Sequence, residues 1–325
     1  MKFTVADLEQ KILDLLKTRG FSDADAAQIV APIMWAETHG NKQGLLKLIG
    51  EPGLQKDTGE RPISIDKESA STANFDGGEH NAMLVAQAMI IKAVELLENS
   101  GVVAIGSHAT HSSSGALTYY IEQLAAKGYV AIMMCRTPPF MVPFKTIEPL
   151  FGTNPFAISY PSKDGPLSFD MATAAAAFYN LLVFSTEGKK IDPRLFIDSA
   201  GQPTDDPAKV IDGGATLPFD GGYKSSALGM MVELLAGPLV GGAFCDDTGG
   251  EWGHLLIAID PDNFVGRDAF AEKVSAAVAK IRSTPTSDGK PVQLPGDHSR
   301  KVHDAVQASG EIDIPENILE KLGWK

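Results

Sequence analysis

The sequence has 325 residues, of which 44% are hydrophobic, so it can bury one large core or two ordinary ones, and global disorder is excluded. The formal net charge of −13 argues against a nucleic-acid or anionic-membrane partner, because both need a basic surface. The first residues lack an apolar secretion segment, and no apolar run approaches the roughly 20 residues that span a bilayer. We therefore expect a soluble cytoplasmic protein.

The first forty residues are expected to form two helices. Thr4 is a good N-cap for the first helix, which Gly20 should end. Ser22 caps the second helix, and Pro32 inside that helix predicts a kink or a break. The second helix should end at Thr38–Gly40.

Strands and helices alternate through the middle of the chain. Short apolar segments bounded by turn residues predict strands over 102–106, 129–135, 156–160 and 255–259. Helical periodicity predicts helices over 86–99, 117–127, 223–235 and 264–281. This alternation is typical of the α/β or α+β class.

The end of the chain and the two cysteines complete the pattern. Residues 282–300 are rich in Pro, Ser, Asp and Gly, which predicts a long connection with little regular structure. Residues 314–322 should form a short helix with Pro315 in its first turn. Cys135 ends an apolar run and is expected to be a buried thiol, and with Cys245 it makes no disulfide framework.

Polar residues at the ends of these elements are the candidates for chemistry. His39, at a helix end, is either a partner of the helix dipole or a proton donor. The segment Ser107–Gly115 is either a surface loop or a set of backbone N–H groups that can bind phosphate. Lys224 follows two glycines at a helix start, so it is either a solvated side chain or part of an anion site.

Two acidic segments have simple structural interpretations. Asp170 follows an apolar strand and should cap a helix over 174–182. Asp260–Asn263 carries carboxylates without a neighbouring His or Cys, so we expect a strand-ending turn and no metal site. The chain contains neither a Gly-x-Gly-x-x-Gly after a strand nor a P-loop, which disfavours a Rossmann enzyme.

Four dense blocks, taken together and in order, carry a family resemblance. They are Glu37–Gly40, Leu150–Pro155, Phe169–Thr173 and Leu217–Leu235. These blocks resemble the malate/L-lactate dehydrogenase family of NAD(P)-dependent oxidoreductases, which is unrelated to the Rossmann-type lactate and malate dehydrogenases. The resemblance implies a non-Rossmann central-sheet cofactor domain over 76–264 and a helical domain formed by both chain ends, 1–75 plus 265–325. It also implies a homodimer.

The resemblance assigns roles to individual residues. His39 would donate the proton in carbonyl or imine reduction, with the hydroxyl of Thr38 beside it. Thr153 and Gln43 would contact the substrate, Gln43 standing where the family often has an arginine. NADP or NAD would be bound by residues of four segments: His111, Ser112, Ser113 and Ser114; Asp170, Met171 and Ala172; Tyr223 and Lys224; Gly296 and Asp297.

The substrate expected from the resemblance is a small carboxylate. Ser226 and the two residues after it resemble the branch that reduces Δ1-piperideine-2-carboxylate and Δ1-pyrroline-2-carboxylate, so we expect an NAD(P)H-dependent reductase of cyclic 2-imino carboxylates. One alternative is an L-2-hydroxy acid dehydrogenase acting on malate, lactate or ureidoglycolate. Another is a non-catalytic nucleotide or small-molecule binder, motivated by Gln43, by Asn180 and by Ser112 and Ser113, which stand where the family has loop histidines.

Overall fold

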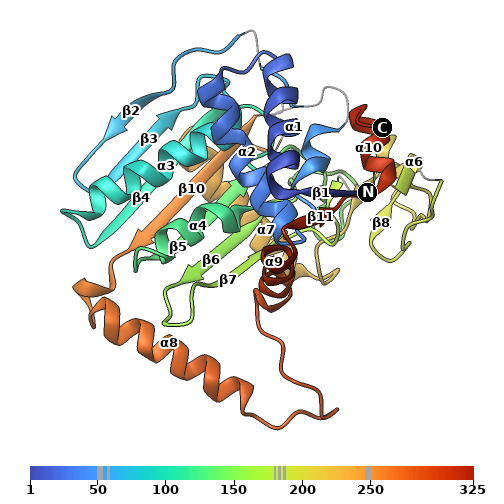
Figure 1. Cartoon of the computed structure of the whole chain (residues 1–325). Coiled ribbons are helices and arrows are strands. Elements are labelled where there is room, and N and C mark those ends of the chain that lie inside the picture. The colour runs from blue at the N-terminus through green and yellow to red at the C-terminus, as the bar shows by residue number, and fades with distance from the viewer. Residues whose placement is uncertain (50–53, 57–58, 179–180, 182–183, 186–187, 246–250) are drawn as a thin grey trace.

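The computed structural model describes residues 1–325 except 50–53, 57–58, 179–180, 182–183, 186–187 and 246–250. At its centre is a seven-stranded mixed sheet with the strand order β2-β3-β4-β10-β5-β6-β7 (Figure 1). The strands are β2 (Ser64–Glu68), β3 (Thr72–Asp76), β4 (Val102–Thr110), β5 (Val130–Arg136), β6 (Phe156–Tyr160), β7 (Leu167–Met171) and β10 (Trp252–Ile259). β3 and β4 are parallel and the other neighbours are antiparallel. The predicted fold class, with its central sheet, is confirmed.

Helices cover both faces of this sheet. α3 (Ala82–Leu97) and α4 (Leu117–Ala125) pack on one face through a core that includes Met89, Ile105 and Tyr120. α7 (Tyr223–Ala236) and the short η2 (Pro238–Val240) pack on strands β5 and β10, where Val232 and Leu255 are buried together. A small two-stranded sheet of β8 (Phe196–Ile197) and β9 (Ala215–Thr216), with α6 (Pro207–Ile211), lies apart from the main sheet.

A second apolar core joins the two ends of the chain. It contains α1 (Val5–Thr18), α2 (Asp23–Thr38), η1 (Leu45–Leu48), α9 (Asp297–Ser309) and α10 (Glu316–Leu322). β1 (Lys2–Thr4) pairs antiparallel with β11 (Glu311–Asp313) beside this core. Leu8, Ile12 and Leu16 at one end of the chain are buried with Ile314 and Leu319 at the other.

The local signals at the start of the chain are confirmed. The Thr4 hydroxyl accepts a hydrogen bond from the N–H of Asp7 at 3.0 Å, and Ser22 caps α2 in the same way through Asp25. α2 continues through Pro32, so of the expected kink or break the break does not occur. Pro32 is buried against neighbouring side chains, and this packing offsets the hydrogen bond that proline cannot donate.

Other element boundaries differ from the sequence pattern. β4 runs to Thr110 rather than Gly106, because the Ser107 hydroxyl is buried in the sheet against Nδ1 of His254 (3.2 Å). Residues 174–177 are not helical, so the helix expected over 174–182 does not start there. The tail of the chain contains α9, which the pattern did not predict.

The last long helix is shorter than expected and lies at the margin of the molecule. The turn after β10 is the short η3 (Pro261–Asn263), as predicted, and α8 (Arg267–Arg282) begins only after it. Figure 1 shows α8 extending away from the sheet, and Ala271 is its one buried residue. Within the described ranges, no helix is both long and apolar enough to cross a membrane.

Candidate active site

His39 lies at the C-terminal end of α2, and hydrogen bonds fix its imidazole. Nδ1 is 2.7 Å from the carbonyl oxygen of Trp35 and 3.1 Å from Oγ1 of Thr38. A carbonyl oxygen can only accept, so Nδ1 carries the hydrogen and Nε2 is the nitrogen left for proton exchange. The Thr38 hydroxyl donates in turn to a carbonyl one turn back, Met34 at 2.9 Å or Trp35 at 3.0 Å.

Two aromatic rings stack on the His39 imidazole. The Trp35 ring centroid is 4.3 Å away with an interplanar angle of 15°, and the His303 centroid is 4.2 Å away with an angle of 20°. Burial is the largest influence on His39 and lowers its pKa, the hydrogen bond to Trp35 opposes this, and the nearby charge of His303 lowers the pKa further. His303 belongs to α9, so sequence periodicity gave no sign of it.

The turn after His39 is tied to η1, which carries a buried lysine. The Glu37 carboxylate accepts the N–H of Leu45 at 2.6 Å, and burial raises the pKa of Glu37 to about 7 against the effect of this hydrogen bond. Lys47 in η1 is 5% exposed, and burial lowers its pKa to about 7. Its position in the apolar run Leu45–Ile49 is the only sequence signal for this burial.

The segment His111–Gly115 joins β4 to α4 at the N-terminal ends of α3 and α4. Ser112 has a left-handed backbone (φ 63°), and its hydroxyl accepts from the side-chain amide of Asn81, the N-cap of α3, at 2.6 Å. Ser113 accepts from the N–H of Gly115, while the carbonyl of Ser114 accepts from Tyr120. The backbone carbonyl of Gln43 lies 3.8 Å from where a Cβ on Gly115 would stand. The fold therefore brings the Gln43 segment and this loop together.

Thr153 lies in a turn whose backbone is fully anchored. Its N–H donates to the Thr137 hydroxyl at 2.9 Å, and its carbonyl accepts the N–H of Thr173 at 2.9 Å. The next residue, Asn154, is buried in a left-handed conformation (φ 40°) and donates to Oε2 of Glu233 at 2.8 Å.

A buried ion pair supports this turn from the end of β5. Nε of Arg136 donates to Oε1 of Glu233 at 3.1 Å, and both side chains are fully buried. Burial, the largest influence, raises the pKa of Glu233, while Asn154 and Arg136 lower it. Arg136 also donates to the carbonyl of Glu251 at 2.5 Å, so the pair joins β5, α7 and the segment before β10.

Asp170 does not cap a helix that follows it. It lies in β7, and its carboxylate accepts the backbone N–H of Thr118 at 3.2 Å and the hydroxyl of Thr118 at 3.0 Å. It therefore caps α4, whose own N-cap residue, Ala116, has no capping side chain. The interpretation of Asp170 as a cap was right, but the helix was wrong. Met171 and Ala172 follow it and are half-buried.

The remaining expected cofactor contacts lie at two helix starts. Tyr223 and Lys224 open α7 on the surface, where the Asp220 carboxylate binds the N–H of Gly222 at 2.6 Å. Gly296 (φ 84°) precedes α9, and the Asp297 carboxylate accepts from Arg282 and from the N–H of Leu294 at 2.8 Å. Asn180 lies outside the described residues.

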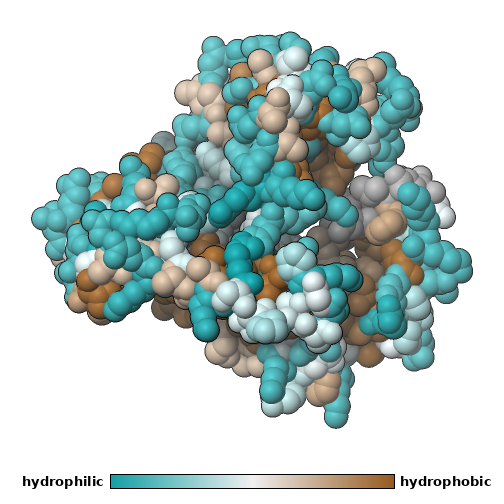
Figure 2. Space-filling model, turned by 60° about the horizontal axis from the view of Figure 1, so that its bottom comes forward, coloured by the Kyte–Doolittle hydropathy of each residue, from teal (hydrophilic) through white to brown (hydrophobic). Residues whose placement is uncertain are grey.

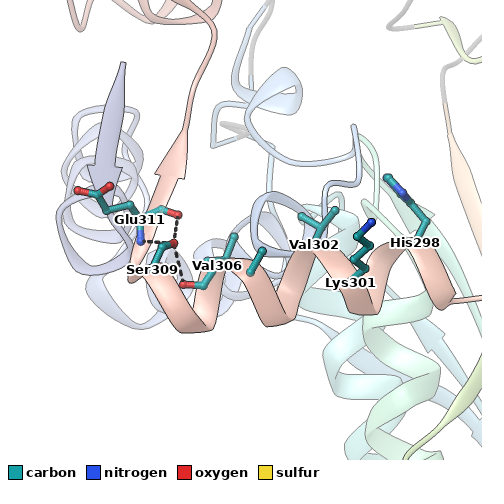
Figure 3. A pocket seen from close by; sticks show the side chains of 7 residues that line it. His298, Lys301, Val302, Val306, Ser309 and Glu311 are labelled. Carbon is teal, nitrogen blue, oxygen red and sulfur yellow. Dashed lines mark hydrogen bonds between the residues drawn. The ribbon is translucent and has the colours of Figure 1, made fainter.

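Two cavities lie beside α9. One of about 570 Å3 borders the His39 turn and is lined in part by Glu37, Gly40 and Val302. The other, of about 330 Å3, runs along α9 from His298 to Ser309 and reaches Glu311 at the start of β11 (Figure 3). Figure 2 shows a largely hydrophilic face with hydrophobic residues gathered in a hollow between its lobes.

Comparison with known proteins identifies relatives of this chain. The sequence profile described as malate/L-lactate dehydrogenase matches residues 3–323. A malate/(S)-sulfolactate dehydrogenase of Methanothermus fervidus is 36% identical over 268 residues, which cover 80% of this chain and 77% of that protein. A Δ1-pyrroline-2-carboxylate/Δ1-piperideine-2-carboxylate reductase of Pseudomonas syringae is 35% identical over 259 residues, covering 76% and 71%.

Solved structures agree with these sequence relatives. The crystal structure of Δ1-piperideine-2-carboxylate reductase from Pseudomonas syringae is similar with a TM-score of 0.85 and 28% identity, covering 99% of this chain and 98% of that one. Sulfolactate dehydrogenase from Methanocaldococcus jannaschii is similar with a TM-score of 0.82 and 26% identity, covering 99% and 95%.

Proposed function

This chain belongs to the malate/L-lactate dehydrogenase family of NAD(P)-dependent oxidoreductases, and we propose that it reduces small cyclic 2-imino carboxylates of the Δ1-piperideine-2-carboxylate and Δ1-pyrroline-2-carboxylate type. The division into a helical domain, 1–75 plus 265–325, and a cofactor domain, 76–264, is part of this proposal. Because the family consists of enzymes, the alternative of a non-catalytic binder loses its support.

The observation that carries the proposal is the setting of His39. With Nδ1 bonded to the Trp35 carbonyl, the neutral ring accepts a proton at Nε2, and the charged ring can donate it to a substrate nitrogen or oxygen. The lowered pKa of His39 makes the charged ring a stronger acid. In this role Thr38 fixes the ring from its Nδ1 side.

The substrate carboxylate would meet neutral and cationic groups. The Thr153 hydroxyl is half-buried on an anchored backbone, so it can donate without moving. Gln43 offers an amide where an arginine would offer a charge. The buried ammonium of Lys47 lies in the same segment as Gln43, and an anion nearby would stabilise its charged form.

The chemistry of the candidate cofactor residues fits an anionic dinucleotide. Lys224 is exposed at the start of α7, whose N-cap, Gly222, provides no side chain to bind the first N–H groups. Ser112, Ser113 and Ser114 offer hydroxyl and backbone donors near the start of α4. When bound, NADPH or NADH supplies the hydride to C2 of the substrate.

The relatives also support a second candidate, oxidation of an L-2-hydroxy acid. The malate/(S)-sulfolactate dehydrogenase of Methanothermus fervidus and an L-sulfolactate dehydrogenase of Methanothermobacter thermautotrophicus, at 36% and 34% identity, each match 80% of this chain. The hypothesis of a cyclic-imine substrate is favoured by the segment after Lys224. It is also favoured by Ser113, which stands where the family has a histidine that could serve as a second acid. An iminium accepts hydride more readily than a neutral ketone, so a site with one acid suits the imine.

Steady-state kinetics tests the choice. We expect a kcat/KM for Δ1-piperideine-2-carboxylate or Δ1-pyrroline-2-carboxylate at least about tenfold above that for pyruvate, oxaloacetate or glyoxylate, which needs only about 1.4 kcal/mol of differential transition-state binding. NADPH and NADH are compared at one pH. Faster turnover of a 2-keto acid would instead assign the chain to the hydroxy-acid dehydrogenases.

We also propose that the chain is a homodimer. α7 and η2 expose a row of apolar side chains, namely Met230, Met231, Leu234, Leu235 and Leu239. Leu239 is 64% exposed, and an apolar patch of this kind on a helix is typical of an interface. Sedimentation equilibrium measures the state directly, and a monomer at micromolar concentration would contradict the proposal.

A further inference from the structure

The His39 imidazole is enclosed on three sides. Trp35 and His303 both stack nearly parallel to it with centroids 4.3 and 4.2 Å away. Two rings at such distances would overlap if they shared one face, so they cover opposite faces. Nδ1 is bonded to the Trp35 carbonyl. The edge that carries Nε2 is therefore the part of the ring left to reach another molecule.

We infer that His303 is a positioning residue which, with Trp35, clamps the His39 imidazole so that Nε2 alone can exchange a proton with the substrate. The inference rests on the proposed function, because it assumes that His39 is the proton donor. It adds a residue from the far end of the chain to the reaction. The sequence blocks that carry the family resemblance, including Glu37–Gly40 around His39, give no indication of His303.

α9 is docked onto the His39 turn at more than one point. The Ser299 hydroxyl donates to the backbone carbonyl of His39 at 3.1 Å. Gly40 has a left-handed backbone (φ 65°), and Val302 lies 3.2 Å from where its Cβ would stand. His303 follows Val302, one helical turn after Ser299, so these contacts fix the depth and rotation at which its ring meets His39.

The polar character of His303 points to more than packing. Its Nδ1 is buried and makes no hydrogen bond within the described part of the chain, a cost that a phenylalanine of similar shape would avoid. The His303 ring lies 4.2 Å from the His39 ring, and its charge effect lowers the pKa of His39. The clamp therefore fixes the orientation of His39 and also destabilises its charged form, as a strong acid requires.

Other charged groups lie on the elements that surround the stack. Glu37 lies on α2 itself, Arg300 on α9, and Glu122 on α4. Glu122 interacts with the Trp35 side chain and with Arg300, while burial raises its pKa. The direct charge effect on His39 comes from His303.

The test compares His303→Phe and His303→Ala with His298→Phe, the same change at an exposed position of α9. The first readout is the NMR titration of the His39 ring without substrate, assigned with His39→Gln. We expect the titration midpoint to rise in His303→Phe, because the charge effect of His303, which lowers the pKa of His39, is removed and a π face takes its place. His298→Phe should leave it unchanged.

The second readout separates kcat from KM. We expect His303→Ala to lower kcat by about 10- to 100-fold with little change in the KM for cofactor, since a misplaced donor costs rate rather than binding. His303→Phe should restore most of kcat by restoring the stack. An unchanged His39 titration together with wild-type kcat in His303→Ala would overturn the inference. The NMR readout needs no turnover, so it still tests the clamp if His39 proves not to be the donor.

Discussion

The His39 turn and the Thr153 turn are held in place by different means. Around His39, aromatic rings from α2 and α9 stack on the imidazole at the margin of the second core. Around Thr153, a fully buried ion pair between Arg136 and Glu233 supports the turn through Asn154. Ring stacking on a half-buried residue can be altered without stranding a buried charge, whereas removing one partner of a buried ion pair cannot. We therefore expect the first turn to control rate and the second to control stability.

Removing the imidazole tests the first half of this comparison most severely. We expect His39→Ala to lower kcat/KM by about 10²–10⁴-fold, the usual loss with a general acid, while thermal unfolding and cofactor affinity change little. Kinetics and a calorimetric scan measure both effects. Activity within a few-fold of the wild type would show that His39 is not the proton donor and that its turn does not control the rate.

Removing the carboxylate of Glu233 tests the second half. We expect Glu233→Ala to lower the free energy of unfolding by about 3–5 kcal/mol, because Arg136 is left buried without its partner. Denaturant titration followed by circular dichroism measures this change.

A matched control is the exposed pair of Lys163 and Asp268, 2.8 Å apart. Asp268→Ala should cost at most about 1 kcal/mol. If Glu233→Ala and Asp268→Ala lowered the free energy of unfolding equally, the Arg136–Glu233 pair would stabilise the protein no more than a surface pair. The proposed difference between the two turns would then be wrong.

The pH dependence of the free energy of unfolding tests the role of a buried histidine, His254, in the central sheet. His254 is fully buried between Ser107 and Cys135, and burial lowers its pKa to about 4. Between pH 6.5 and 4 the unfolded chain binds this proton and the folded chain does not, so stability is full above pH 6.5 and falls as the pH drops through 4. The loss approaches about 3 kcal/mol.

His254→Gln should flatten the unfolding free energy across this window. The expectation fails if His254→Gln and the wild type lose stability in parallel between pH 6.5 and 4.

The features that could be read from the sequence are those decided by neighbours along the chain. Thr4 and Ser22 cap the helices they precede because a cap bonds to an N–H three residues away. Asp170 misled because its carboxylate caps a helix that starts 53 residues earlier in the chain, at Leu117. That contact depends on β7 lying beside α4, which no local pattern records.

The candidate site shows the same limit. Thr38, His39 and Thr153 lie in recognisable blocks, and their roles remain predictions. His303 follows a Pro- and Gly-rich segment that gave no indication of it, and the only indication for Lys47 was its place in an apolar run. The residues that surround a side chain in three dimensions decide its chemistry. For His39, one of the two stacking rings belongs to His303, 264 residues further along the chain.

The pairing of β1 with β11, and of α2 with α9, has a consequence for biosynthesis. A ribosome releases α1 and α2 first, with the apolar faces that later bury Val306, Ile312 and Leu319 still open. Until the α9 segment emerges, the ring of His39 has no partner on its second face. A stalled or clipped nascent chain would thus expose apolar surface to chaperones, and its His39 imidazole would lack the stacking partner that α9 supplies.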